Sequence, residues 1–130
     1  MAQIASPTIQ LTAPTTSQLP TVPLDVEVRV TGAINLAGFE FDLGYNAALV
    51  QVTGMTLAPF IGTTTSCDAT TTRCAIALGP RTSAQGTSVG AYSYGTGVGT
   101  TGDGVLAILH LQPAGVSGTT VLHLSNALIA

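Results

Sequence analysis

Four acidic side chains occupy two short segments in which every second residue is apolar: Asp25, Glu27, Glu40 and Asp42. Two carboxylates that flank a cleft can hydrolyse a glycosidic bond, one as an acid and the other as a base or nucleophile. In these segments the acids alternate with Leu, Val and Phe, so they fall on the outward faces of strands. The spacing therefore favours a solvated acidic face, or a contact with a partner, over catalysis.

Two histidines could share a metal ion if the chain between them turned back on itself. His110 and His123 lie on the last two apolar segments, and Pro113–Gly118 between them has the composition of a hairpin turn. A hairpin would place the two rings on one face as diagonal neighbours, but the sequence offers no third ligand at a predictable position. Asp103 lies between two glycines, which is more typical of a turn than of a calcium site. We therefore predict neither a metal nor a cofactor.

Aromatic and hydroxyl side chains offer two further kinds of chemistry. Tyr92 and Tyr94 share one face of an alternating segment, and together with Tyr45 they could stack on a sugar. The chain has no Trp and few aromatic residues for a carbohydrate-binding module, so packing in the core or at an interface is favoured. The sequence has no Gly-x-Ser-x-Gly elbow, and its glycine-rich stretch 95–104 does not precede a helical segment. We therefore predict that the protein is not an enzyme.

The only two cysteines, Cys67 and Cys74, lie in a Thr-rich segment. A zinc site would need further ligands close by, and neither a histidine nor a third cysteine is near. A local disulfide that closes a loop is the favoured interpretation. Disulfides persist in oxidising compartments, so we expect the protein to be secreted or to lie at the cell surface.

Strands must position these side chains, because the alternation of apolar and polar residues dominates the sequence. The pattern is clearest in Leu24–Thr31 and Phe39–Tyr45, and Gly32 and Asn35 are predicted to mark the turn between them. No window of ten or more residues has the periodicity of an amphipathic helix. The sequence predicts a single domain over residues 1–130, an all-β antiparallel β-sandwich of about eight strands. The shorter predicted strands are Thr8–Thr12, Leu49–Met55, Cys74–Gly79 and Ser88–Gly95, and the last two, which are long, are Gly104–Gln112 and Thr119–Ile129.

The charge of the chain excludes several kinds of partner. Only 7% of the 130 residues are charged, against about 25% in an average soluble domain, and the net charge is −3. Without a basic patch, neither nucleic acid nor an anionic membrane surface is expected as a partner. No apolar stretch approaches the roughly 20 residues of a membrane span, so membrane insertion is not expected. A surface this poor in charge repels copies of itself weakly, which favours either burial in an assembly or a coat of sugars on Thr63–Thr72.

Four segments resemble, in the same order and spacing, the strands of cohesin-like modules: Asn35–Asn46, Leu49–Met55, Gly102–Leu109 and Gly118–Ala127. The resemblance extends over residues 8–128. It implies a nine-stranded jelly-roll β-sandwich that lies outside the cell. Some members of the family bind the calcium-loaded dockerin modules of enzymes, and others occur in surface and structural proteins.

The resemblance also implies a partner-facing strand. In cohesin-like modules the dockerin surface lies on the sheet that contains the strand matching Phe39–Tyr45. Glu40 and Asp42 would take its outward positions. The sequence departs from the family after this strand, since Asn46 stands where many members have Asp.

The family's final strand has no counterpart in this sequence, because members continue past the segment matching Gly118–Ala127 into a strand that pairs beside the first one. We expect an extended segment of a neighbouring copy to fill the gap. The N-terminal segment 1–13 is the candidate donor, with Ile4, Ile9 and Leu11 as its apolar anchors. A head-to-tail exchange does not close on itself and would build a filament. The alternative is that this sequence simply lacks the strand.

These observations favour a non-catalytic, extracellular structural or assembly module that acts through protein–protein contacts. Its expected partners are other copies of itself, in a homopolymer, or a dockerin-like module. A carbohydrate-binding module is the alternative from another functional class.

Overall fold

The computed structural model describes residues 7–13, 21–64, 67, 73–83 and 86–130, and every regular element in this part of the chain is a β-strand. The strands form two antiparallel four-stranded sheets, sheet A in the order β1-β2-β7-β4 and sheet B in the order β5-β6-β3-β8. The strands are β1 (Thr8–Thr12), β2 (Leu24–Leu36), β3 (Gly38–Gly44), β4 (Val50–Leu57), β5 (Cys74–Ser83), β6 (Gly86–Tyr94), β7 (Thr100–Pro113) and β8 (His123–Ile129).

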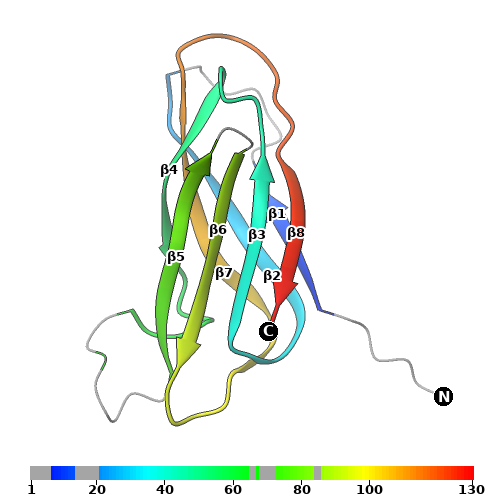
Figure 1. Cartoon of the computed structure of the whole chain (residues 1–130), viewed down its shortest axis with the longest axis vertical. Helices are drawn as coiled ribbons and strands as arrows, with labels where there is room; N and C mark the ends of the chain where they lie inside the picture. Colours follow the sequence, from blue (N-terminus) through cyan, green and yellow to red (C-terminus); the bar gives the residue numbers. More distant parts are fainter. Residues whose placement is uncertain (1–6, 14–20, 65–66, 68–72, 84–85) are drawn as a thin grey trace, which may run out of the picture.

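The two sheets stack face to face and enclose one apolar core. Figure 1 shows sheet B in front of sheet A, with the edge strands β1 and β8 on the same side of the sandwich. On the other side, β4 and β5 contact each other. The predicted antiparallel β-sandwich is therefore confirmed.

The core follows from the period-two pattern of the sequence. Val26, Val28 and Val30 of β2 are at most 1% exposed, and Phe41 and Leu43 of β3 are at most 2% exposed. Their chain neighbours are polar and point outward. The other buried apolar residues are Ala33, Leu36, Phe39, Val50, Val52, Ile61, Ala75, Val89, Ala91, Leu106, Ala107, Leu109 and Leu111.

The turn that the sequence predicts at Gly32 and Asn35 is wrong. β2 continues through both residues to Leu36, and its pairing with β7 is shifted on either side of Ala33. Gly32 and Asn35 take positive φ angles of 71° and 52°, which let the strand bulge without ending. The N–H of Gly32 donates to Oδ1 of Asp103 at 2.8 Å, so this carboxylate accepts a hydrogen bond from the backbone of the bulge.

The hairpin predicted at Pro113–Gly118 is also wrong, because β7 belongs to sheet A and β8 to sheet B. The chain crosses from one sheet to the other after β7. His110 consequently lies in sheet A and His123 in sheet B, and the two rings do not share a face.

The N-terminal strand completes the sheet of its own chain. β1 pairs antiparallel with β2, from Thr8 opposite Thr31 to Thr12 opposite Glu27. Ile9 and Leu11 are partly buried against the core. The described part of the expected donor segment therefore lies in place within its own domain, while Ile4 falls outside the described residues.

The predicted disulfide is confirmed. Cys67 and Cys74 are joined with their Cα atoms 5.9 Å apart. The bond ties the loop to the first residue of β5, where Thr63 also forms a parallel bridge with Cys74. In the described part of the chain, no helix has the length and apolar character needed to cross a membrane.

Candidate functional site

The outer face of sheet B carries the candidate site, and its side chains come from all four strands. The strand register arranges them in rows across the sheet: Ile76 lies opposite Tyr92, and Glu40 lies between Gly90 and Leu128. We call this surface the B face. It consists of Gly38, Glu40, Asp42, Ile76, Leu78, Arg81, Ser88, Gly90, Tyr92, Tyr94, Asn126 and Leu128.

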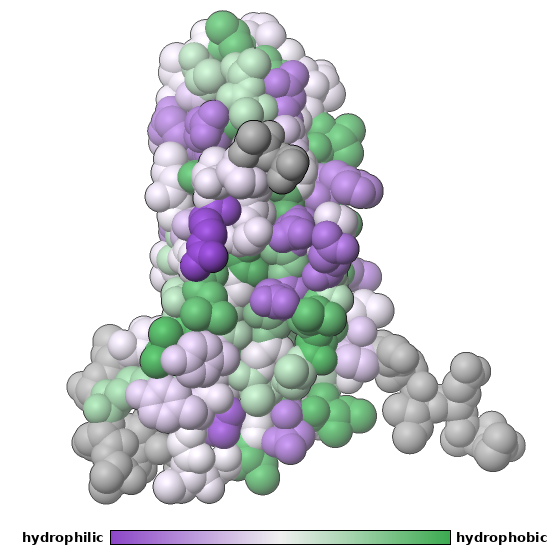
Figure 2. Space-filling model, viewed as in Figure 1, coloured by the Kyte–Doolittle hydropathy of each residue, from purple (hydrophilic) through white to green (hydrophobic). Residues whose placement is uncertain are grey.

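Large apolar side chains are left in solvent on this face. Ile76, Leu78, Tyr92, Tyr94 and Leu128 are between 38% and 60% exposed. They are five of the ten large hydrophobic side chains that are exposed in the described residues. Figure 2 shows this side of the molecule, where apolar groups lie among hydrophilic ones. Single exposed apolar residues are ordinary, but several on one sheet face are typical of an interaction site.

The two tyrosines of the B face lie side by side as the sequence predicts. The ring centroids of Tyr92 and Tyr94 are 6.4 Å apart and the planes are inclined by 38°. Both rings are exposed, so the packing in the core that the sequence analysis allowed for them is wrong. Tyr45 does not join them, since it is partly buried and its hydroxyl is hydrogen bonded to that of Thr87.

A shallow hollow of about 390 Å³ opens beside these apolar groups. Gly90 is one of the residues that line the hollow. A Cβ atom at this position would lie 2.7 Å from the backbone oxygen of Phe39, so a larger residue would not fit there. Leu78 and Arg81 of β5 line one side, and Glu40 and Asp42 of β3 line another. The B face therefore has a hollow with charged side chains and Leu78 at its sides, next to the exposed apolar residues.

Asp42 is held at the edge of the hollow by two neutral donors. Asn126 donates from Nδ2 to Oδ2, and Ser88 donates from Oγ to Oδ1, both at 2.8 Å. These hydrogen bonds, that of Asn126 first, hold the pKa of Asp42 below its usual value. The carboxylate is therefore a fixed negative charge on the B face.

The sequence analysis missed Asn126, which a bulge in β8 aims at Asp42. Glu40 pairs with Leu128 and Asp42 with Ser125, so β8 has one residue more than β3 between these pairs. Asn126 has a φ of 52°. Asn tolerates this left-handed conformation better than most residues, and that preference is the only local signal in the sequence.

Glu40 and Arg81 carry the two other charges of the B face. Both are exposed, and neither forms a hydrogen bond or an ion pair within the described residues. Their charges are available to a partner at no cost of breaking an internal contact.

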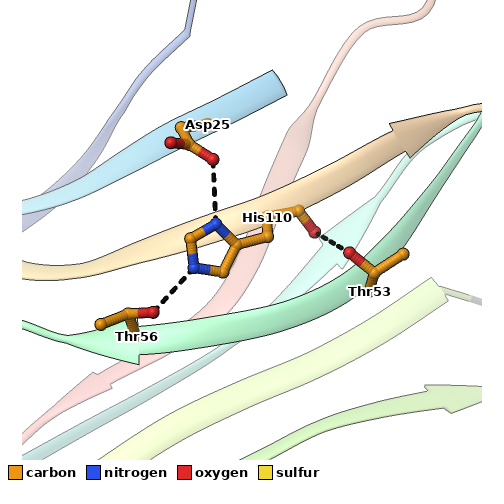
Figure 3. Close-up of polar contacts among 4 residues, drawn as sticks. All are labelled: Asp25, Thr53, Thr56 and His110. Atoms are coloured by element: carbon orange, nitrogen blue, oxygen red, sulfur yellow. Dashed lines mark hydrogen bonds and ion pairs between the residues drawn. The ribbon is translucent and has the colours of Figure 1, made fainter. Parts of the chain in front are cut away.

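Sheet A presents a different polar cluster on its outer face (Figure 3). Nδ1 of His110 lies 2.9 Å from Oδ1 of Asp25, and Nε2 lies 2.7 Å from Oγ1 of Thr56. The hydroxyl of Thr53 donates to the backbone oxygen of His110 at 3.1 Å. The four side chains come from β2, β7 and β4, so the cluster ties three adjacent strands together.

A hydroxyl, an imidazole and a carboxylate in this order resemble the arrangement that activates a nucleophile in acyl transfer. The side chains of His110 and Asp25 are 40% and 68% exposed, whereas catalysis of this kind depends on a water-excluded site with preorganised donors. The hollow lies on the opposite sheet. The cluster is therefore best suited to joining strands.

The structure separates the four predicted carboxylates into two pairs. Asp25 and Glu27 lie on sheet A, where Glu27 forms an ion pair with Arg29 at 3.1 Å. Glu40 and Asp42 lie on the B face, at the outward positions that the sequence analysis assigned to them. Within the described residues, no three acidic, histidine or cysteine side chains are grouped so as to hold a metal ion.

No family model matches the sequence, and no curated protein matches it either.

Solved structures of cohesin modules are similar to this one. A non-cellulosomal cohesin from the hyperthermophilic archaeon Archaeoglobus fulgidus has a TM-score of 0.63 at 17% identity, over 96% of this chain and 78% of that one. A cohesin module from a Clostridium perfringens family 33 glycoside hydrolase has a TM-score of 0.60 at 16% identity, over 95% and 84%. The sixth cohesin of Acetivibrio cellulolyticus scaffoldin B, solved in complex with a mutant Cel5 dockerin, has a TM-score of 0.62 at 11% identity, over 93% and 84%.

These matches cover nearly the whole of this chain. The chain therefore has a cohesin-like fold, which confirms the fold that the sequence motifs imply.

Proposed function

We propose that this chain is a non-catalytic protein–protein interaction module that docks a partner protein through the B face. The observation that carries this proposal is the composition of the face. It combines five exposed apolar side chains with a hollow, and it leaves the charges of Glu40 and Arg81 without partners in the described residues. Interfaces of this kind derive most of their affinity from a few apolar and aromatic residues around a depression.

The similar structures support a dockerin-like partner. The Acetivibrio cellulolyticus cohesin was solved bound to a dockerin, and its fold is shared by this chain. An extracellular or cell-surface location is part of the same proposal. The Cys67–Cys74 disulfide supports it, because such bonds persist in oxidising compartments.

Binding of purified dockerin modules, measured by calorimetry in the presence of calcium, tests the proposal. A double variant, Leu78→Ser with Tyr92→Ser, should weaken binding by about 2 kcal/mol or more, which is about thirtyfold. The matched control is Val121→Ser, since Val121 is 77% exposed but lies outside the B face. Equal losses in the double variant and the control, or no binding of any dockerin, would contradict the proposal.

Carbohydrate binding is tested with the same face. The adjacent rings of Tyr92 and Tyr94 are the observation that favours it. A glycan array that shows binding by the native protein and none by a Tyr92→Ala, Tyr94→Ala double variant would support a sugar as the ligand. No binding by the native protein would eliminate this alternative.

Self-association is a second candidate, supported by β1, which pairs on one side only among the described residues. In the form expected from the sequence, residues 3–13 of one copy would fill the place of the missing final strand in the next copy, with Ile4, Ile9 and Leu11 as apolar anchors. Such an exchange builds a filament. Filaments seen by negative-stain microscopy, and lost when residues 1–13 are deleted, would support it; a closed oligomer would contradict it.

A further inference from the structure

A bulge in β5 decides which side chain this strand places at the hollow of the B face. Leu78 pairs with Gly90, and Arg81 pairs with Ser88. β5 therefore has one residue more than β6 between these two pairs. Unbroken alternation from Leu78 would have put Pro80 opposite Ser88, and the bulge puts Arg81 there instead. Bulges of this kind re-aim side chains and are common next to functional sites.

Gly79 makes this bulge possible. Its φ is 95°, a conformation that residues with a Cβ atom rarely adopt. A Cβ atom at this position would also lie 2.8 Å from the backbone oxygen of Ser88. The place of Arg81 on the B face thus depends on a glycine that no other residue could replace without strain.

Arg81 shares the hollow with two carboxylates but pairs with neither of them in the described structure. Glu40 and Asp42 line the same hollow, yet no ion pair joins either of them to Arg81. Both oxygens of Asp42 already accept hydrogen bonds, from Ser88 and Asn126. Two strand spacings, or about 10 Å, separate the backbone of Arg81 from that of Asp42. The guanidinium is therefore available to a carboxylate from outside this chain.

The charges of the hollow are divided by sign between its two sides. Arg81 lies on β5, whereas Glu40 and Asp42 lie on β3, with the uncharged Gly90 of β6 between them. An acidic group of a partner would be attracted to the β5 side and repelled at the β3 side, and a basic group would behave in the opposite way. Repulsion in the wrong arrangement selects the partner as much as attraction in the right one does.

We infer that Arg81 is a specificity-determining residue of the B face, where it binds the carboxylate of an Asp or Glu side chain on the docked protein. This inference rests on the docking function proposed above. A guanidinium and a carboxylate can form two parallel hydrogen bonds, so the contact fixes the orientation of the partner as well as the sign of its charge. The same partner presents a basic side chain to Glu40, about 10 Å away across the sheet.

Charge reversal on both sides of the interface tests the inference, by calorimetry with a dockerin module that binds the native protein. Arg81→Glu should weaken binding by about tenfold or more, because it places a third carboxylate at the hollow and against the partner's acid. Each exposed Asp or Glu of the dockerin, apart from its calcium ligands, is then changed to Lys. One of these dockerin variants should bind the Arg81→Glu protein about tenfold more tightly than the unchanged dockerin does.

Arg29→Glu is the matched control, since it makes the same change in net charge on the outer face of sheet A, where Arg29 is exposed. It should alter binding by less than about twofold, because salt screens charges this far from the partner. Thermal unfolding shows whether each variant is folded. If the reversal at residue 81 unfolds the chain, Arg81→Gln carries the test, and it should weaken binding in the same direction but by less.

Three results would overturn the inference and leave docking on the B face intact. These are unchanged binding by the Arg81 variants, a loss no greater than that of the control, and a loss that no dockerin variant restores. If no dockerin binds the native protein, the docking function itself fails, and this inference fails with it.

Discussion

The two sheets cover one core from opposite sides, yet their outer faces use polar groups in different ways. On sheet A the polar groups pair with one another: Asp25 with His110, and Glu27 with Arg29. On sheet B the carboxylate of Asp42 is held by neutral donors, while Glu40 stands among exposed apolar side chains. A face whose polar groups are already paired gains little from a partner. A face with unpaired charges around apolar surface is completed by one.

Replacing one glycine by alanine in each sheet should give the largest difference in the free energy of unfolding. Gly90→Ala should lower the free energy of unfolding by about 1–3 kcal/mol, because its Cβ would lie 2.7 Å from the Phe39 backbone oxygen and the strands must shift. Gly54→Ala should change it by less than about 0.5 kcal/mol, since its nearest contact would be an ordinary 3.8 Å to the ring of His110. Urea denaturation measures both, and equal effects would contradict the geometry of the hollow.

Removing His110 separates stability from docking. His110→Ala loses the contacts with Asp25 and Thr56 and should cost about 0.5–1 kcal/mol, because the cluster is exposed. Partner binding on the other sheet should not change, and neither should any activity in a hydrolase screen. Turnover that disappears in His110→Ala would instead make the cluster catalytic.

Neutralising one carboxylate on each face sharpens the comparison further. Glu27→Gln and Glu40→Gln should each alter stability by less than about 0.5 kcal/mol. Only Glu40→Gln should change the association rate of a docking partner and its dependence on salt, because Glu27 already has a partner within the chain. If the two variants slow association equally, the B face is not the docking site.

The smallest effect concerns pH. The pKa of Asp42 in the folded protein is below its ordinary value, so its hydrogen bonds stabilise the fold above a pH of about 3.8. This contribution is lost as the pH falls through the lowered pKa. Asn126→Gly removes the main donor and suits the positive φ, so it should raise the pKa of Asp42. Titration of the Asp42 carboxyl by NMR measures the change, and an unaltered pKa would contradict the assignment.

Local alternation was enough to predict the strands and which residues face outward. In Leu24–Thr31 and Phe39–Tyr45 the apolar residues face the core and the polar ones face outward, as expected. A half-buried strand can be predicted locally because successive side chains point to opposite faces. Glu40 and Asp42 could therefore be placed on an outer face from the sequence alone.

Pairings between distant residues could not be predicted in the same way. His110 meets Asp25 across 85 residues, and Asp42 meets Asn126 across 84. Both contacts depend on which sheet each strand joins, and that choice is made by tertiary packing and not by local propensity. The composition of Pro113–Gly118 is equally suited to a hairpin and to a crossover, so the predicted hairpin failed.

The alternation of exposed and buried side chains at the end of β6 has a consequence for how the surface of this fold can change in evolution. Along β6, exposed Tyr92 and Tyr94 are neighbours in sequence of buried Ala91 and Ser93, so each surface position can be exchanged while the residue that holds the fold stays in place. If the B face docks a partner as proposed, the residues that select the partner and those that hold the fold alternate along this strand. Substitutions at the exposed positions can then change the binding surface while the buried residues keep the fold stable. A new binding specificity could therefore evolve through intermediates that all remain folded.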